Sequence, residues 1–103
     1  MAKIFITLTG TKYYHGSNFL KKGMKLTLIK EPDNDYDKEA IKVTLEGLGD
    51  IGYVANSVHT VLGECMSAGR LYDKIGDSAS AKVVLVTNHG TICKINKKSL
   101  LEK

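Results

Sequence analysis

The sequence predicts a mostly β fold, a small barrel of about six strands with one or two helices. Its 103 residues fit one domain spanning residues 1–103, because no repeat, linker or low-complexity tract divides them. Apolar and polar residues alternate along several runs, which is the period of a strand with one face in water. Helical spacing occurs in one segment alone. An open α+β sheet is the alternative arrangement of these elements.

Six short segments are expected to be strands. In the first three, apolar residues alternate mainly with lysine and threonine. The last two flank Asn88-His89-Gly90, which suits a hairpin turn because asparagine and glycine tolerate a positive φ. The expected strands are residues 4–9, 24–28, 41–45, 51–54, 83–87 and 91–95.

One helix is expected to follow the fourth strand. Its apolar residues recur at i, i+3, i+4 and i+7, which places them on one helical face. Asn56 or Ser57 can cap its start and Gly69 its end. A glycine in its middle, Gly63, costs about 1 kcal/mol relative to alanine. The residues of the apolar face are Val58, Val61, Leu62 and Cys65, so Cys65 is expected in the core.

The net charge of +4 is divided unevenly along the chain. Residues 1–30 hold six lysines and no acidic residue, residues 31–50 carry a net −5, and residues 51–103 a net +3. A basic surplus of this size permits a polyanionic partner and does not require one, because a solvated basic surface has the same composition.

Composition places the protein among ordinary soluble domains. Hydrophobic residues make up 43% and charged residues 25%, and no apolar run approaches the roughly 20 residues that cross a bilayer. The first residues are too polar for a signal peptide. Two cysteines, Cys65 and Cys93, are too few for a disulfide framework, which favours a reducing, cytoplasmic location.

Residues 47–52 match the pattern G-x-G-x-x-G of dinucleotide-binding loops. A pyrophosphate site needs a helix that begins at the third glycine, whereas Gly52 lies within an expected strand. We interpret the segment as a glycine-rich turn between two strands and expect no cofactor. No nucleophile elbow or Ser-His-Asp order is visible, so we expect a protein that is not an enzyme.

Three alternate aspartates, Asp33, Asp35 and Asp37, open like a calcium-binding loop. That loop needs glycine and later a bidentate acid at positions where this sequence has Lys38 and Thr44. The histidines are scattered without partners at metal-ligand spacing. We predict no metal site. A Mg²⁺-binding carboxylate cluster, serving a metal-dependent nuclease or phosphoesterase, is the weaker alternative.

The segment Lys12-Tyr13-Tyr14-His15-Gly16 follows the first strand. Two adjacent tyrosines after an alternating strand cannot both point into the core, so at least one is expected at the surface. An exposed ring stacks on a nucleic-acid base while a neighbouring lysine meets the phosphate. The alternative is a core tyrosine with its neighbour on the rim.

Residues 31–40, here called the acidic loop, precede the third strand and contain one aromatic residue, Tyr36. An ordinary turn collects similar polar residues. Carboxylates repel phosphates, but they accept hydrogen bonds from hydroxyls and base amines. An acid in a nucleic-acid site is therefore suited to a sugar hydroxyl or a base edge.

Together, these two segments resemble the HIRAN domain, a module of certain fork-remodelling helicase-like ATPases that also occurs as a stand-alone bacterial protein. The resemblance covers about residues 3–70 and rests on two motifs in combination. The first is Lys12-Tyr13-Tyr14-His15-Gly16, which matches (Lys/Arg)-Tyr-Tyr-x-Gly. The second, Pro-x-Asn-x-Tyr-Asp-x-x-Ala-Ile-x-Val, is matched by residues 32–43, and the strand Ile51–Val54 follows.

The resemblance implies an OB-like barrel that binds single-stranded DNA, in the fork-remodelling members at a free 3′ end. Carried onto this sequence, Tyr13 and Tyr36 are the base platforms. Lys12 is the basic residue of the motif, and Asp37 accepts the 3′-hydroxyl. The acidic stretch of a basic protein then becomes part of the binding site.

Four further residues complete the predicted site. Tyr14 and Tyr53 belong to the matching segments, and Asn56 and Ser57 open the expected helix, where their N–H groups can hold a phosphate. Two departures from the family predict weaker phosphate binding. Other members often carry lysine where this chain has Asn56, and Lys12 replaces an arginine with its planar, bidentate group.

Two other classes of function are compatible with the sequence besides DNA binding. A small barrel with exposed strands can pair with the edge of a partner protein. The metal-dependent phosphoesterase is the other. Because the sequence contains no ATPase, any remodelling of DNA is expected to need a protein partner that supplies ATPase or nuclease activity.

Overall fold

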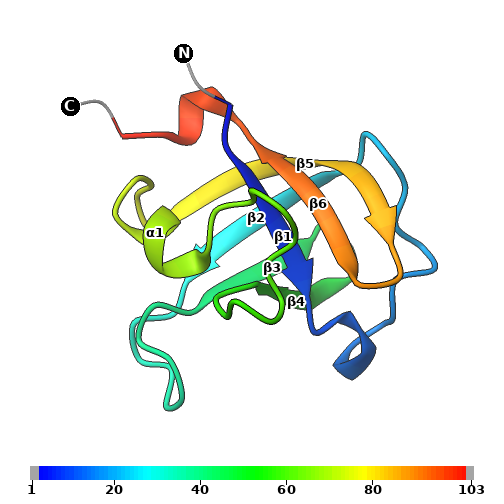
Figure 1. The fold of residues 1–103 in the computed structure, drawn as a ribbon, viewed down its shortest axis with the longest axis horizontal. Helices are drawn as coiled ribbons and strands as arrows, with labels where there is room; N and C mark the ends of the chain where they lie inside the picture. The colour runs from blue at the N-terminus through cyan, green and yellow to red at the C-terminus, as the bar shows by residue number, and fades with distance from the viewer. Residues whose placement is uncertain (1–2, 102–103) are drawn as a thin grey trace.

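A computed structural model describes residues 3–101 and shows a closed barrel of six antiparallel strands (Figure 1). The strands pair around the barrel in the order β1-β4-β3-β2-β5-β6. The mostly β class and the six strands are confirmed, and the open sheet is wrong. The strands are β1 (Phe5–Thr9), β2 (Lys25–Lys30), β3 (Ile41–Leu45), β4 (Gly49–Val54), β5 (Ser78–Thr87) and β6 (Gly90–Ile95); the helices are η1 (Thr11–Tyr13), α1 (Ala68–Tyr72) and η2 (Lys97–Ser99).

Inward-facing residues of all six strands fill the barrel. Their alternation follows the predicted period, so that in β6, for example, every second residue from Thr91 is buried. Burial raises the pKa of the Cys93 thiol to about 12, which marks this cysteine as a core residue. Within residues 3–101 no helix is long and apolar enough to span a membrane. The largest buried strand residues are Ile6, Leu8, Leu26, Leu28, Ile41, Ile51 and Ile95.

β5 begins at Ser78, well before the predicted start at Val83. Its first half alternates serine with alanine, and the alanines Ala79 and Ala81 point into the core. Such small side chains give a weak apolar signal, which explains the missed start. The β5–β6 hairpin forms as predicted, but no described residue other than glycine has a positive φ, so Asn88 does not use that conformation.

The glycine-rich segment of residues 47–52 begins in the turn between β3 and β4, as predicted, and its last four residues start β4. Leu45 pairs with Gly49 across the turn, and Gly47 lies at its tip with a φ of 88°. No helix starts at Gly52, which lies within β4. The dinucleotide interpretation is therefore excluded by the local structure.

The predicted helix after the fourth strand is wrong. Residues 57–65 form turns and loop, and Val58, expected on the buried face, is 91% exposed. Gly63 has a φ of 53°, which no right-handed helix accommodates. The β-branched valines and threonine before it have weak helix propensity. Cys65 is therefore only partly buried and lies in a loop rather than on a helix face.

This loop covers the edge of β1 that β4 leaves unpaired. β1 pairs with β4 through its last two residues only. The N–H of Ala55 donates to the carbonyl oxygen of Thr7 (2.8 Å), the N–H of Leu62 to its hydroxyl oxygen (3.1 Å), and the N–H of Met66 to the carbonyl oxygen of Phe5 (2.7 Å). β1 therefore offers no open edge with which a strand of a partner protein could pair.

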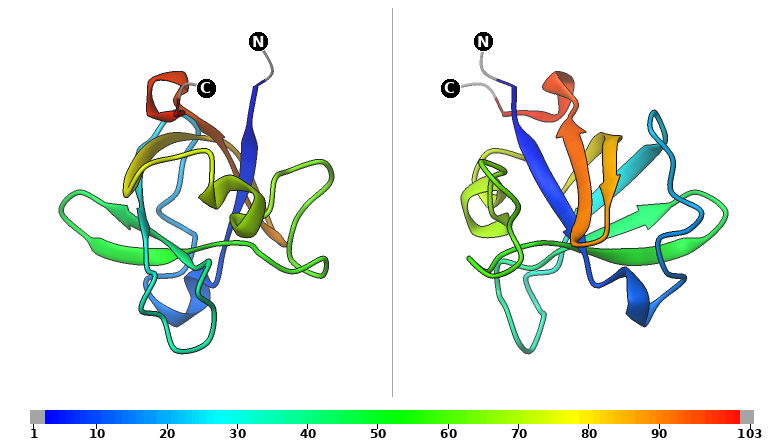
Figure 2. Two further views of the ribbon diagram at one scale, coloured as in Figure 1. Left: turned by 90° about the vertical axis from the view of Figure 1, so that its left-hand side faces the viewer. Right: turned by 45° about the vertical axis from the view of Figure 1, so that its right-hand side comes forward.

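The α-helix α1 starts where the predicted helix was to end, so that Gly69 lies inside it. It is capped by Ser67, whose hydroxyl oxygen accepts the N–H of Arg70. α1 lies across one end of the barrel (Figure 2). Ala68 and Leu71 are fully buried in the same cluster as the strand residues, so α1 closes this end of the core.

We predict that Gly52→Ala destabilises the fold. A Cβ at this position would lie 2.6 Å from the carbonyl oxygen of Thr9 and 2.7 Å from Cδ1 of Leu8. Overpacking of this kind costs about 1–3 kcal/mol of unfolding free energy, which urea titration measures. The matched control is Gly76→Ala, where a Cβ meets nothing within 4 Å and should change stability by less than about 0.5 kcal/mol. Equal stability of the two variants contradicts the prediction.

Candidate nucleic-acid interface

Two segments, η1 and the acidic loop, project from the lower side of the barrel in Figure 1, the acidic loop toward the left and η1 toward the right. Each carries a tyrosine with its ring in solvent, Tyr13 at 77% exposed and Tyr36 at 98%. Tyr14 is also exposed, at 41%. Neither member of the adjacent pair packs in the core, so the core-tyrosine interpretation is wrong. Exposed rings present apolar faces on which bases can stack.

Lys12 and Tyr13 line a cleft of about 440 Å³ between η1 and the β5–β6 turn. The ammonium nitrogen of Lys12 lies 5.2 Å from the centroid of the Tyr13 ring, within the range of a cation–π interaction. Asn88 and His89 of the turn form the facing wall. The cleft thus places a cation, an aromatic face and polar side chains around one space.

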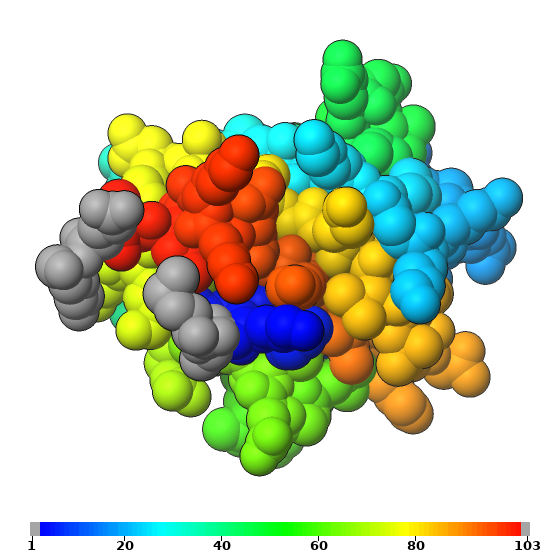
Figure 3. Space-filling view, turned by 90° about the horizontal axis from the view of Figure 1, so that it is seen from above, coloured from blue at the N-terminus to red at the C-terminus, as the bar shows by residue number. Residues whose placement is uncertain are grey.

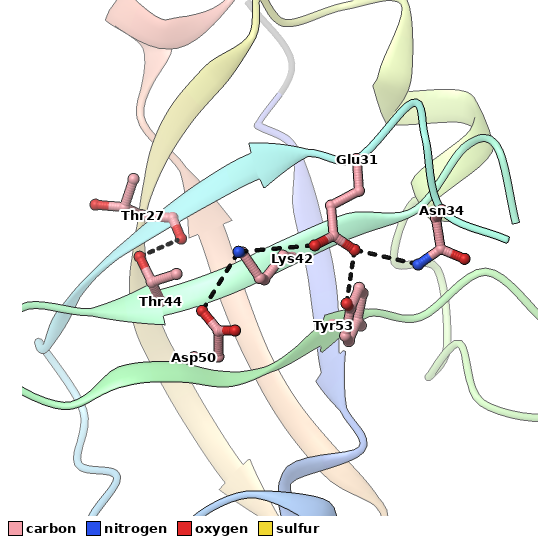
Figure 4. Close-up of polar contacts among 7 residues, drawn as sticks. All are labelled: Thr27, Glu31, Asn34, Lys42, Thr44, Asp50 and Tyr53. Atoms are coloured by element: carbon pink, nitrogen blue, oxygen red, sulfur yellow. Dashed lines mark hydrogen bonds and ion pairs between the residues drawn. The ribbon is translucent and has the colours of Figure 1, made fainter. Parts of the chain in front are cut away.

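Tyr14 and Tyr53 connect η1 to the barrel wall. Their ring centroids are 6.4 Å apart with the planes tilted by 43°, a favourable aromatic geometry. The hydroxyl of Tyr53, on the outer face of β4, donates to Oε1 of Glu31 at 2.6 Å (Figure 4). Glu31 begins the acidic loop, so this bond ties the loop to β4.

A lysine on β3 supports this contact. Nζ of Lys42 lies 3.6 Å from Oε2 of Glu31 and 3.5 Å from Oδ1 of Asp50 (Figure 4). The hydrogen bond from Tyr53, together with those from Asn34 and Lys42, outweighs desolvation and lowers the pKa of Glu31. The same bond to Glu31 raises the pKa of Tyr53. Both shifts favour a charged carboxylate that accepts from a neutral phenol.

Asn34 shapes the acidic loop from within. Its Nδ2 donates to Oε1 of Glu31 (3.1 Å), while its Oδ1 accepts the N–H groups of Tyr36 (2.9 Å) and Asp37 (3.0 Å). Such asparagine turns hold the backbone in one conformation. The exposed ring of Tyr36 therefore stands on a loop whose backbone is fixed on both sides.

Asp37 is half-buried, and both of its carboxylate oxygens accept hydrogen bonds. Oδ1 accepts the N–H of Glu39 (2.9 Å), and Oδ2 accepts from Nδ2 of Asn56 (2.8 Å). Oδ1 of Asn56 in turn accepts the N–H of Gly69 in α1 (2.8 Å). A carboxylate has about four acceptor positions, so about two remain for an incoming donor.

Asn56 and Ser57 do not start a helix, so a helix terminus cannot supply phosphate binding there. Within residues 3–101, however, the N–H groups of these two residues donate to no protein acceptor. Both residues line a hollow of about 390 Å³ together with Arg70 of α1. The side chain of Asn56 acts as a brace between Asp37 and α1, while Arg70 brings a cation to the same hollow.

The three aspartates of the acidic loop do not form a metal cluster. Among the described residues no group of three His, Cys, Asp or Glu side chains is placed to hold a metal ion. Asp33 and Asp35 are exposed, whereas Asp37 is held by Asn56. The structure thus gives the metal-dependent phosphoesterase no support.

The structure adds three residues that sequence reasoning missed: Glu31, Asn34 and Arg70. Asn34 could have been recognised from the sequence, because the side chain of a loop asparagine commonly accepts the N–H of the residue two positions later, here Tyr36, in an Asx turn. Glu31 and Arg70 carried no such signal. Glu31 accepts a hydrogen bond from Tyr53, and Arg70 lines a hollow together with Asn56 and Ser57. In both cases the neighbour is distant in sequence.

A small closed barrel with exposed tyrosines, a neighbouring lysine and free backbone donors has the features of barrels that bind nucleic acid. The comparison with protein families agrees with this class, since the model of the HIRAN domain matches residues 1–102. The chain belongs to the HIRAN domain family. HIRAN domains are DNA-binding modules, so the protein is a nucleic-acid-binding domain rather than an enzyme.

Two solved structures are similar in fold. The HIRAN domain of human HLTF aligns with a TM-score of 0.61 and 19% identity, over 95% of this chain and 79% of that chain. A protein from Lactobacillus plantarum gives a TM-score of 0.61 and 20% identity, over 91% and 93%. No curated protein matches the sequence. At these identities the structural likeness establishes the barrel alone.

We predict that the Tyr53–Glu31 bond makes stability depend on pH. Because the pKa of Glu31 lies below its ordinary value of 4.5, its contribution is present above that value and is lost as the pH falls through the folded pKa. Tyr53→Phe removes the largest cause of the shift. The loss of unfolding free energy between about pH 5 and pH 3, measured by urea titration, should be smaller in this variant than in the wild type.

Tyr14→Phe is the control, because it leaves the Tyr53 hydroxyl in place. It should keep the acid-dependent loss of the wild type. An identical pH profile for Tyr53→Phe and the wild type contradicts the assignment.

Proposed function

We propose that the protein binds single-stranded DNA at a free 3′ end, with Asp37 accepting the hydrogen bond of the 3′-hydroxyl. The observation that carries the proposal is the hydrogen bonding of the Asp37 carboxylate. Its carboxylate is fixed by Asn56 and by its own loop, keeps acceptor capacity, and lies next to the exposed Tyr36. A carboxylate in this position disfavours a phosphate and favours a hydroxyl.

Surrounding residues supply the remaining contacts. Tyr36 and Tyr13 are the two most exposed of the described tyrosines and serve as base platforms. Lys12, beside Tyr13, is suited to a phosphate. Tyr14 and Tyr53 hold the two projecting segments together rather than stacking freely, because their rings contact each other.

The backbone of Asn56 and Ser57 is the second phosphate contact in this proposal. Their N–H groups are available, and Arg70 lies in the same hollow. Charged hydrogen bonds from Arg70 to the phosphate would offset the affinity lost because position 56 is not a lysine. A protein partner that supplies ATPase or nuclease activity would act on the DNA end that this domain holds.

We predict that a 3′-hydroxyl oligonucleotide binds about tenfold or more tightly than the same oligonucleotide with a 3′-phosphate. A hydrogen bond to a charged group is worth about 1.5–3 kcal/mol, and the phosphate adds repulsion. Fluorescence anisotropy at fixed salt measures both dissociation constants. Asp37→Asn, which is nearly isosteric, should remove most of the difference. Equal affinity of the wild type for the two ends refutes end capture and leaves strand binding intact.

We also predict that Tyr36→Ala weakens binding of the 3′-hydroxyl oligonucleotide by about five- to a hundredfold, because stacking on one base is worth about 1–3 kcal/mol. Tyr13→Ala should have a loss in the same range. The matched control is Tyr36→Phe, which keeps the ring and should bind like the wild type. Since Tyr36 is fully in solvent, urea titration should show no loss of stability in any Tyr36 variant. Wild-type affinity of Tyr36→Ala refutes the stacking role.

A further inference from the structure

A surface lined by lysines lies on β2, β5, β6 and η2, on the side of the barrel opposite the acidic loop and η1 (Figures 1 and 3). It surrounds a hollow of about 370 Å³ whose lining includes five lysines and no acidic residue. The lysines, here called the lysine face, are Lys25, Lys82, Lys94, Lys97 and Lys98.

Three of these lysines stand side by side across the sheet. Lys82 of β5 lies directly opposite Lys25 of β2 and Lys94 of β6. All three point away from the core, since their strand neighbours such as Ala81 and Val83 are buried. Like charges directly opposite each other on adjacent strands destabilise a sheet. The free protein carries this cost, and an anion across the three strands would relieve it.

No carboxylate among residues 3–101 pairs with the lysine face. Lysines elsewhere on the sheet have partners. Lys42 contacts Glu31 and Asp50, and Lys30, at the far end of β2, lies 4.4 Å from the ring centroid of Tyr72. Among residues 3–101, the lysines of the face are therefore distinguished by the register that aligns three of them and by the absence of an ion pair with a carboxylate.

The chemistry of the lysine face fits an extended polyanion better than a small ligand. Its ammonium groups are flexible point charges without the fixed geometry of a built pocket. Aromatic residues are absent from the lining of the hollow, so nothing there stacks on a base. Three adjacent strands span about 10 Å, a length over which a nucleic-acid backbone presents several phosphates.

We propose that the lysine face is a second nucleic-acid contact, which binds the phosphodiester backbone of single-stranded DNA independently of a free end. The proposal rests on the nucleic-acid binding in the proposed function and does not require capture of a 3′ end. A strand held at its end by the acidic loop is bound along its length by the lysine face.

Circular single-stranded DNA tests the proposal, because it has phosphates and no ends. The double variant Lys97→Gln/Lys98→Gln is compared with Lys21→Gln/Lys22→Gln, an equally exposed adjacent pair outside the hollow. Dissociation constants are measured over a salt series. Each phosphate contact on a single strand contributes about 0.7 to the slope of log affinity against log salt. Lys97→Gln/Lys98→Gln should lower the slope by about 1.4, which corresponds to two phosphate contacts. The control pair should lower it by less than half of that, and Asp37→Asn should leave it unchanged.

Three results overturn the proposal. The first two are a wild-type slope for Lys97→Gln/Lys98→Gln and an equal loss of slope in Lys21→Gln/Lys22→Gln. The third is binding of the wild type to phosphatidylserine vesicles that Lys97→Gln/Lys98→Gln loses while its DNA affinity stays unchanged. The last result assigns the face to a membrane. End capture fails separately, when linear DNA with a 3′-hydroxyl and with a 3′-phosphate bind alike. That failure leaves the result with circular DNA unaffected.

Discussion

The hydrogen bond from the Tyr53 hydroxyl to Glu31 joins the rigid wall of the barrel to the acidic loop, and the geometry of the candidate site depends on it. Glu31 in turn positions Asn34, whose side chain sets the backbone at Tyr36 and Asp37. On its other side Tyr53 packs against Tyr14, which follows η1. One β4 residue thus contacts both segments that project from this side of the barrel. The loop keeps its shape without burying an apolar residue of its own at the tip.

The unequal distribution of charge has a structural explanation in this arrangement. Two acidic residues of the loop have different roles: Glu31 holds the loop to β4, and Asp37 is the proposed acceptor of the 3′-hydroxyl. Glu31 forms an ion pair with Lys42 and accepts the hydrogen bond of the Tyr53 hydroxyl, whereas Asp37 keeps free acceptor positions. In the proposed function, such a site discriminates a hydroxyl from a phosphate, which a purely basic surface does not. In the same proposal, affinity for the phosphates comes from cations outside the loop, at Lys12, Arg70 and the lysine face.

The sequence predicted the strands well because alternation is a local property of the chain. It missed the start of β5, where alanine and serine alternate and the apolar signal is weak. The helix was wrong because spacing alone ignored the left-handed Gly63 and the β-branched residues before it. In the site, the motif residues were recognisable one by one. The bond between Glu31 and Tyr53 and the position of Arg70 beside Asn56 depend on the tertiary fold, and the alignment of Lys25, Lys82 and Lys94 depends on strand pairing, neither of which a single sequence encodes visibly.

In the proposed function, one end of the barrel, built around Asp37 and Tyr36, receives the end of a DNA strand. Amide chemical shifts in ¹H–¹⁵N spectra, followed during titration with a short single strand ending in a 3′-hydroxyl, test it most directly. The largest shifts should fall on Tyr13, Tyr36, Asp37, Asn56 and Ser57, and a 3′-phosphate should greatly reduce them at Tyr36 and Asp37. Shifts that leave these residues unchanged and appear only on other faces of the barrel contradict it.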